Sequence, residues 1–158
     1  GAVALMLLRV GAGDVFAVET PRAMAVSEAA AAAATKAGET VANRRLVERL
    51  TRLMADERIY RQENVTIGAL ATRLGIPEYR LRRLINSELG YRNFSSFLNS
   101  HRIAEAQAAL ADPAQAEVPV ITIAMDAGFQ SLGPFNRAFK AVTGVTPTEY
   151  RRMRRSAA

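Results

Sequence analysis

The sequence predicts an all-α fold of about seven helices, arranged as two helix-turn-helix subdomains joined by a long central helix. No stretch of useful length after residue 40 alternates apolar and polar residues as a strand does. Apolar residues in that part recur at helical spacing, and glycines and prolines separate the runs. Two of its segments are also similar to each other, which indicates a duplicated structural unit.

The first forty residues are harder to assign than the rest. Residues 2–18 are mostly apolar, but their uninterrupted run is shorter than the ~20 residues that span a bilayer. A strand and a short helix both remain open for residues 1–19. Residues 20–38 are Ala-rich and are interpreted as a linker that is able to form a helix. We therefore assign residues 1–40 to a linker or to the remnant of an upstream sensory or membrane region, with a loosely packed tail as the alternative.

Residues 41–155 are predicted to form the folded domain. An amphipathic helix is expected from about Thr40 to Glu57, because apolar residues line one of its faces and arginines the other. Thr66 and Ser131 are expected to cap helices, and glycines to end them. The later predicted helices are Ile67 to Leu74, Pro77 to Leu89, Asn93 to Leu110, Val120 to Ala127, Leu132 to Thr143 and Pro147 to Met153. The first helix-turn-helix thus covers 66–90, the linker helix 93–110 and the second helix-turn-helix 120–144.

The chain contains an internal repeat, formed by IGALATRLGIPEYRLRRLINSELG and ITIAMDAGFQSLGPFNRAFKAVTG. Ala71 matches Ala124, and Gly75 matches Gly128, at an offset of 53 residues. The glycines that end the two segments match at an offset of 54, because the second turn contains one more residue. A repeat of this kind predicts two copies of the same helical motif.

The repeated residues are those that a helix-turn-helix requires. A small side chain is needed where the two helix backbones approach, which is the place of Ala71 and Ala124. Four residues later, a glycine can take the left-handed conformation of the turn. Large apolar residues then hold each second helix, namely Leu81, Leu84 and Ile85 in one unit and Phe135 and Phe139 in the other. Ordinary helical hairpins are the alternative, but two matches in one basic chain favour helix-turn-helix units.

The charge distribution favours a nucleic-acid partner. Lys and Arg number 21 and Asp and Glu 15, which gives a formal net charge of +6. Residues 43–158 carry 18 basic and 11 acidic residues, whereas residues 1–42 carry 3 and 4, so the positive charge belongs to the predicted helical domain. Nineteen of the basic residues are Arg, which binds phosphate and guanine edges in a bidentate manner. A solvated basic surface without a partner is the alternative.

Several classes of chemistry are disfavoured by the composition. The chain has no Cys and one His, which excludes disulfides, thiolate metal sites, a Cys nucleophile and a paired-His site. Gly11 and Gly13 follow an apolar run, but Phe16 stands where a dinucleotide-binding loop has its third glycine. We therefore expect no enzyme activity and no cofactor or metal.

Residues 124–152 read AMDAGFQSLGPFNRAFKAVTGVTPTEYRR and resemble the C-terminal DNA-binding domain of the AraC/XylS transcription regulators. The resemblance is carried by the G-F pair, the F-x-R-x-F-K core and the G-x-T-P-x-x-Y-R ending, and it extends over about Asn43 to Arg152. It implies that residues 41–155 bind double-stranded DNA sequence-specifically in a bacterial, cytoplasmic regulator with a separate sensory region. The segment ADERIYRQENVTIGALATRLGI is similar to a branch whose upstream part is often a membrane region, which implies membrane anchoring of a full-length protein.

Each second helix is expected to place its N-terminal half in the major groove, with the two helices in adjacent grooves. The outward residues of the first unit are Tyr79, Arg80, Arg82 and Arg83. The resemblance places base or phosphate contacts at all of these except Arg80, and Arg82 and Arg83 are the best candidates for guanine readout. The candidates in the second unit are Ser131, Leu132, Gly133, Asn136 and Arg137. For each Arg, phosphate contact without sequence information is the alternative.

The second unit is expected to read fewer bases than the first. Gly133 and Pro134 replace the polar and aromatic residues that are usual in the family, and Leu132 offers only an apolar contact to a thymine methyl group. Asn136 then remains to pair with adenine, and Arg137 to reach guanine or phosphate.

Partners beyond DNA follow from the resemblance alone. It implies RNA polymerase as a protein partner, a monomeric fragment and a dimeric full-length protein, and it leaves the effector open. A non-specific nucleoid-binding or adaptor protein is the competing interpretation, because such a protein shares the charge but needs no paired recognition helices.

Overall fold

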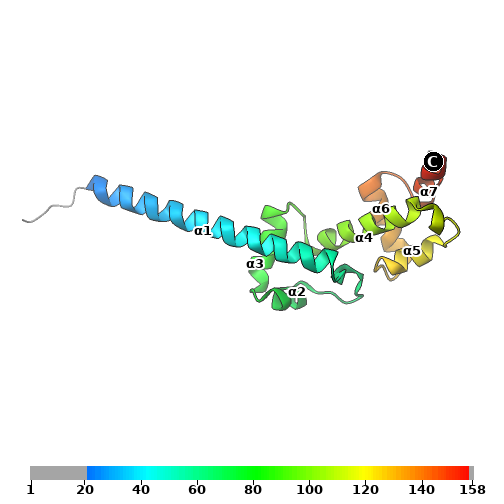
Figure 1. The fold of residues 1–158 in the computed structure, drawn as a ribbon, viewed down its shortest axis with the longest axis horizontal. Helices are drawn as coiled ribbons and strands as arrows, with labels where there is room; N and C mark the ends of the chain where they lie inside the picture. The colour runs from blue at the N-terminus through cyan, green and yellow to red at the C-terminus, as the bar shows by residue number, and fades with distance from the viewer. Residues whose placement is uncertain (1–20, 157–158) are drawn as a thin grey trace, which may run out of the picture. The chain divides into compact units, whose positions relative to one another are not determined.

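The computed structural model describes residues 21–156, which are mostly helical (Figure 1). This part of the chain contains no strand, which confirms the predicted all-α fold. Its α-helices are α1 (Pro21–Ala55), α2 (Ile67–Leu74), α3 (Glu78–Arg83), α4 (Phe94–Ala111), α5 (Val120–Asp126), α6 (Leu132–Thr143) and α7 (Pro147–Ser156). Its short helical turns are η1 (Ile59–Arg61), η2 (Leu84–Glu88) and η3 (Pro113–Gln115).

The chain divides into two compact parts, residues 1–40 and residues 41–158. Residues 21–38, expected to be a linker with helical potential, belong to α1, so this helix begins well before the predicted start at Thr40. The high helix propensity of alanine, which indicated the helical potential of this segment, accounts for the longer helix. The strand or short helix considered for residues 1–19 lies outside the described residues. Among the described helices, none combines the length and the apolar character needed to cross a membrane.

Helix α2 has the predicted bounds because both of its ends carry strong signals. Thr66 caps its start, since the Thr66 hydroxyl accepts a hydrogen bond from the Ala69 amide at 3.1 Å. Gly75 follows its end with φ of 68°, and the Gly75 amide donates to the Thr72 carbonyl at 3.0 Å. The turn predicted between the first two helices of the repeat is therefore confirmed.

Helix α3 differs from its prediction at both ends. Pro77 occupies the capping position in an extended conformation instead of the first turn, and α3 begins at the next residue. The α-helix ends at Arg83 and continues as the π-helical turn η2, in which the Leu89 amide donates to the Leu84 carbonyl at 3.0 Å. The single helix predicted up to Leu89 is therefore wrong in this detail, because no sequence signal marks the wider turn.

Helices α5 and α6 repeat the arrangement of α2 and α3. Ala71 and Ala124 are 2% and 1% exposed, which confirms the small residues expected at the two helix crossings. Gly128 follows the pair's first helix with φ of 100°, in the left-handed region expected for the turn. Ser131 lies at the capping position of α6, but its side chain makes no capping hydrogen bond, contrary to the prediction.

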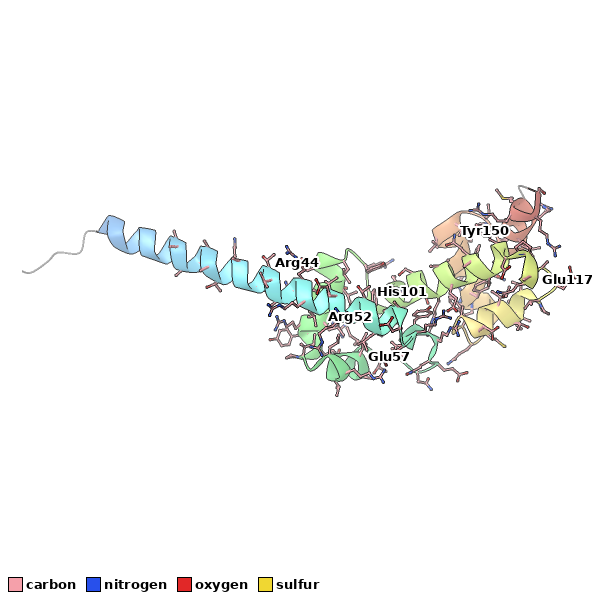
Figure 2. The ribbon with its side chains drawn as sticks, in the orientation of Figure 1. Arg44, Arg52, Glu57, His101, Glu117 and Tyr150 are labelled. Carbon is pink, nitrogen blue, oxygen red and sulfur yellow. The ribbon has the colours of Figure 1, made fainter. Side chains whose placement is uncertain are left out.

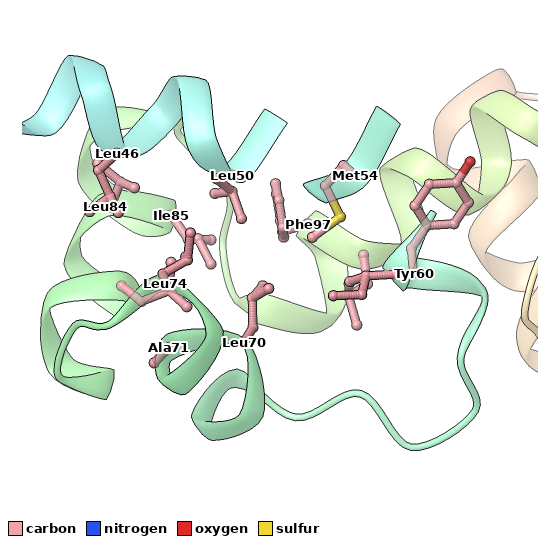
Figure 3. Close-up of a cluster of buried hydrophobic side chains, with 13 residues drawn as sticks. Leu46, Leu50, Met54, Tyr60, Leu70, Ala71, Leu74, Leu84, Ile85 and Phe97 are labelled. Carbon is pink, nitrogen blue, oxygen red and sulfur yellow. The ribbon is translucent and has the colours of Figure 1, made fainter. Parts of the chain in front are cut away.

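The first hydrophobic core lies between α1, α2, α3 and the start of α4 (Figure 3). Leu46, Leu50 and Met54 enter it from α1 at every fourth residue, as the amphipathic pattern predicts. Its other buried members are Ile59, Tyr60, Leu70, Ala71, Leu74, Leu81, Leu84, Ile85, Phe97 and Leu98. The core removes one face of α2 and one face of α3 from water and leaves their other faces available to a partner.

The second hydrophobic core is smaller and more aromatic. The Phe135 ring lies 5.2 Å from that of Phe129 and 5.5 Å from that of Phe139, which in turn lies 5.5 Å from Tyr150 of α7. Its remaining buried members are Ile103, Ala106, Leu110, Ile123, Ala124 and Ala127. Rings from the turn, from α6 and from α7 therefore fix the orientation of α6.

Helix α4 contributes to both cores. Phe97 and Leu98 belong to the first core, and Ile103 is the first of its residues in the second. His101 lies between them, stacked on Tyr60 at 5.7 Å and edge-on to Phe97 at 5.0 Å. Figure 2 shows His101 on this stretch of α4. It is half-buried, as expected for a boundary residue.

We predict that Gly128→Ala destabilises the domain more than Gly75→Ala. Both glycines have positive φ, so an alanine at either position is strained by about 1–2 kcal/mol. A Cβ at Gly128 would also lie 2.7 Å from the Tyr60 carbonyl oxygen and 2.8 Å from the Arg61 Cα, whereas nothing lies within 4 Å at Gly75. Relief of that overlap is expected to cost a further ~1–3 kcal/mol. Urea unfolding measures both losses, and equal losses would contradict the packing at Gly128.

Acidification is predicted to destabilise the domain through His101. Burial lowers the pKa of His101, so the folded protein holds this proton less strongly than the unfolded chain does. The ring is neutral in both states well above about pH 6.5, and stability is lost as the pH falls from there through the lower folded-state pKa. His101→Phe keeps a ring against Tyr60 and Phe97 but removes the titration. Urea midpoints of the wild type and the variant should therefore diverge between about pH 7.5 and 5, and a constant difference would contradict this role.

Candidate nucleic-acid interface

The second helix of each helix-turn-helix is fixed by two side chains with no exposed surface. These are Leu81 and Ile85 in the first unit and Phe135 and Phe139 in the second, all 0% exposed. Because residues four apart share one face of a helix, each pair determines which face turns inward. Arg82 and Arg83 in the first unit and Asn136 and Arg137 in the second lie between the members of these pairs and are exposed.

The two buried pairs also set the correspondence between the units. Both match at an offset of 54, the same offset as the glycines that end the repeats. In this register, Gly133 is the counterpart of Tyr79, and Leu132 is the counterpart of Glu78. The remaining positions correspond as Arg80 with Pro134, Arg82 with Asn136, and Arg83 with Arg137. The second unit therefore has no side chain at the position where the first has its exposed tyrosine.

The first unit presents most of its predicted contacts to solvent. Tyr79 is 71% exposed, which is a high value for a large ring, and Arg82 and Arg83 are exposed as well. Arg80 is half-buried. This helix thus offers a phenol beside several guanidinium groups, a combination that suits a polyanionic partner better than an apolar one.

An ion pair on α3 involves one of the predicted contacts. The Arg82 guanidinium lies 2.5 Å from the Glu78 carboxylate, four residues earlier, and both side chains are about half exposed. Glu78 was absent from the predicted site, although the i, i+4 spacing of opposite charges signals such a pair. The carboxylate thus offsets part of the positive charge of Arg82 on the exposed face of α3.

The second unit offers fewer polar groups, and the structure places its five candidates differently. Ser131, Asn136 and Arg137 are exposed, and Gly133 and Pro134 present only backbone or apolar surface beside them. Leu132 is half-buried and packs against the second core. Part of its side chain therefore serves the core, and its apolar contact with a base stays a prediction.

Some arginines outside α3 and α6 hold the protein together. Arg151 donates to the Val118 carbonyl at 2.7 Å and to the Ala116 carbonyl at 3.4 Å. Arg155 donates to the Ala116 carbonyl at 2.7 Å and forms an ion pair with Glu117 at 3.0 Å. Figure 2 labels Glu117 on the second unit. The formal charge of the chain therefore overstates the positive charge that is available to DNA.

Solved structures share this fold. The C-terminal domain of AraT, a response regulator from Geobacillus stearothermophilus, matches with a TM-score of 0.56 and 29% identity over 70% of this chain and 84% of its own. The C-terminal domain of the two-component response regulator yesN from Fusobacterium nucleatum matches with a TM-score of 0.52 and 25% identity over 60% and 88%. A transcriptional regulator with an AraC-type DNA-binding domain from Chromobacterium violaceum has a TM-score of 0.52 and 24% identity over 58% and 79%, a similarity of fold alone.

Sequence comparisons agree with the structural ones. A family model described as a helix-turn-helix domain matches residues 70–153, which is more than half of the chain. An uncharacterized HTH-type transcriptional regulator from Staphylococcus aureus is 33% identical over 89 residues. That alignment covers 56% of this chain but only 11% of the much longer relative. The chain belongs to the AraC-type helix-turn-helix family of DNA-binding transcription regulators.

Proposed function

We propose that the domain recognises a specific DNA sequence by placing α3 and α6 in adjacent major grooves on one face of a duplex. The observation that supports this most directly is the pair of helix-turn-helix units on one continuous helix, α4. Its 18 residues correspond to a length of ~27 Å. Together with the width of the units, this length is comparable with the ~34 Å between successive major grooves on one face.

The first unit is proposed to supply most of the base readout. Arg82 and Arg83 are the best placed for bidentate contacts with guanine, because both are exposed on the outward face of the second helix. Tyr79 is proposed to contact a base or a phosphate, and half-buried Arg80 is proposed to contact the sugar-phosphate backbone of the DNA. These contacts account for the predominance of polar side chains on this helix.

The second unit is proposed to contribute orientation and few base contacts. Asn136 is suited to adenine and Arg137 to guanine or phosphate, and Ser131 can donate to a phosphate. Neither Gly133 nor Pro134 carries a polar side chain that could read a base. Specificity is therefore expected to be unequal between the two half-sites.

The remaining partners are proposed at the level of the whole regulator. RNA polymerase is the expected protein partner, because a transcription regulator acts on the initiation of transcription. The chain corresponds to a small part of the curated relative that it matches, so effector binding and dimerisation are assigned to regions outside the DNA-binding domain.

Selection from random duplexes tests the proposed specificity. We expect a consensus with two half-sites about 10 bp apart and binding at least ~10³-fold tighter than to unrelated DNA. Each base substitution should cost ~1–3 kcal/mol, with more sensitive positions under α3 than under α6. Arg82→Ala should remove the preference at one base pair and leave the others. Binding without a consensus would instead identify a non-specific nucleoid-binding protein.

The Glu78–Arg82 ion pair generates a second prediction. Glu78→Gln should tighten DNA binding by about three- to tenfold, because it removes a negative charge near the phosphates and releases Arg82. Glu57→Gln is the matched control, since Glu57 pairs with Arg73 at 2.9 Å with a similar exposure but lies outside the second helices. Fluorescence anisotropy titrations measure both affinities. Equal gains would indicate a general charge effect, and weaker binding of Glu78→Gln would indicate that Glu78 itself contacts a base.

A further inference from the structure

Arg102 of α4 contacts the connection that precedes the first helix-turn-helix and the turn of the second. Its Nε donates to the Tyr60 carbonyl at 2.6 Å, and its Nη2 donates to the Gln62 carbonyl at 3.2 Å. Its Cζ lies 5.6 Å from the ring centre of Phe129, in the turn of the second unit. One guanidinium thus bridges the connection that precedes the first unit, the shared helix and the turn of the second unit.

The contacts of Arg102 are not those of an ordinary surface charge. Burial lowers the pKa of Arg102, and its guanidinium contacts two neutral backbone carbonyls and an aromatic ring. Two directed hydrogen bonds and a stacked face use the planar shape of the guanidinium, which a lysine ammonium cannot reproduce. The geometry therefore demands a particular arrangement of the three segments.

Gly128 brings the turn of the second unit close to the backbone of η1 at the same place. A Cβ at this glycine would lie 2.7 Å from the Tyr60 carbonyl oxygen and 3.0 Å from the Arg102 Nε. The turn of the second unit therefore sits directly on η1, next to the guanidinium. A Cβ at Gly75, the matching position of the first unit, would lie within 4 Å of no other atom. Of these two turn glycines, Gly128 is therefore the one with a close backbone approach.

Glu105 adds a further connection, three residues beyond Arg102 on α4. Its carboxylate accepts a hydrogen bond from the Arg61 Nε at 3.0 Å and a weaker one from Arg58 at 3.4 Å. Arg102 and Glu105 together hold η1 against α4 through groups of opposite charge. We call the set of Tyr60, Gln62, Arg102, Glu105, Gly128 and Phe129 the junction.

The junction lies where α4 passes between the two cores. Leu98 is its last buried residue in the first core and Ile103 its first in the second, so the helix between them has no core of its own. A change of about 20° in the direction of α4 at Arg102, nine residues or ~13 Å before its end at Ala111, would move that end by ~5 Å. This exceeds the ~3.4 Å rise of one base pair. Contacts that resist such a change determine which half-site spacing the protein accepts.

We infer that Arg102 is a positioning residue for DNA recognition, which holds the two helix-turn-helix units at one separation and so restricts binding to one spacing of half-sites. This inference rests on the proposed function, because it requires that both α3 and α6 engage the duplex. Arg102 itself needs no contact with DNA for this role.

The test compares duplexes in which one base pair is inserted or deleted between the selected half-sites. For the wild type, we expect each change to weaken binding at least about tenfold, because the second unit loses its contacts. For Arg102→Ala and Arg102→Lys, the penalty should fall to about threefold or less, with weaker binding to the optimal site. Arg151→Ala is the matched control, since Arg151 also binds two carbonyls but within the second unit, and its spacing penalty should remain that of the wild type.

A measurement without DNA covers the case in which a variant binds too weakly. The chain has no cysteine, so Ser87→Cys and Ala141→Cys allow a spin label on each unit. Electron–electron double resonance should give a narrow distribution of distances between the two labels in the protein with Arg102. The distribution should be broader in the Arg102→Lys variant. An unchanged distribution together with an unchanged spacing penalty overturns the inference and leaves the proposed function intact. A wild type that tolerates every spacing, or that needs one half-site only, overturns the proposed function instead.

Discussion

Between Leu98 and Ile103, helix α4 passes from one hydrophobic core into the other, and the rest of the DNA-binding part depends on this shared element. A helix-turn-helix has too few residues to bury its own apolar face, so each unit completes its core with side chains from α4. The orientation of each second helix is thereby fixed relative to the axis of α4. The junction around Arg102 restrains that axis at the point where neither core does.

The same architecture accounts for the asymmetry of the two surfaces. Both second helices are held by a buried pair four residues apart, but the first exposes Tyr79 and several arginines, whereas the second has Gly133 in the matching place. Aromatic packing around Phe135 fixes the second unit, whose outward face carries Asn136 and Arg137 beside Gly133 and Pro134. This asymmetry supports the proposal that the first unit reads most of the bases and the second contributes orientation.

Local signals in the sequence predicted much of this fold. Thr66 and Gly75 delimit α2 to the residue, because a capping hydroxyl and a left-handed glycine act within a few residues of the chain. Helix α1 extends over the Ala-rich residues 21–38, for which the sequence indicated only helical potential. The π-helical turn η2 has no sequence signal and was missed. The predicted helix boundaries were wrong where the local conformational preferences of the residues were weak or absent.

The candidate site was predictable in its helices and less so in its contacts. Exposure of Tyr79, Arg82 and Arg83 follows from helical periodicity around Leu81. Arg102 lies in the predicted linker helix, where the sequence suggests a brace between the two units or a phosphate contact. Its partners could not be predicted, because they are backbone carbonyls some 40 residues away, which no sequence pattern marks. The close approach at Gly128 could not be predicted either, because the sequence does not distinguish a turn glycine with open surroundings from one with crowded surroundings.

The central claim is that the shared helix presents α3 and α6 to one face of a duplex as a single body. Guanine methylation interference on the selected site tests it most directly, because N7 methylation blocks major-groove contacts base by base. We expect two clusters of interference about 10 bp apart on the same face, with the stronger cluster under α3. A single cluster, or two clusters on opposite faces of the duplex, would contradict it.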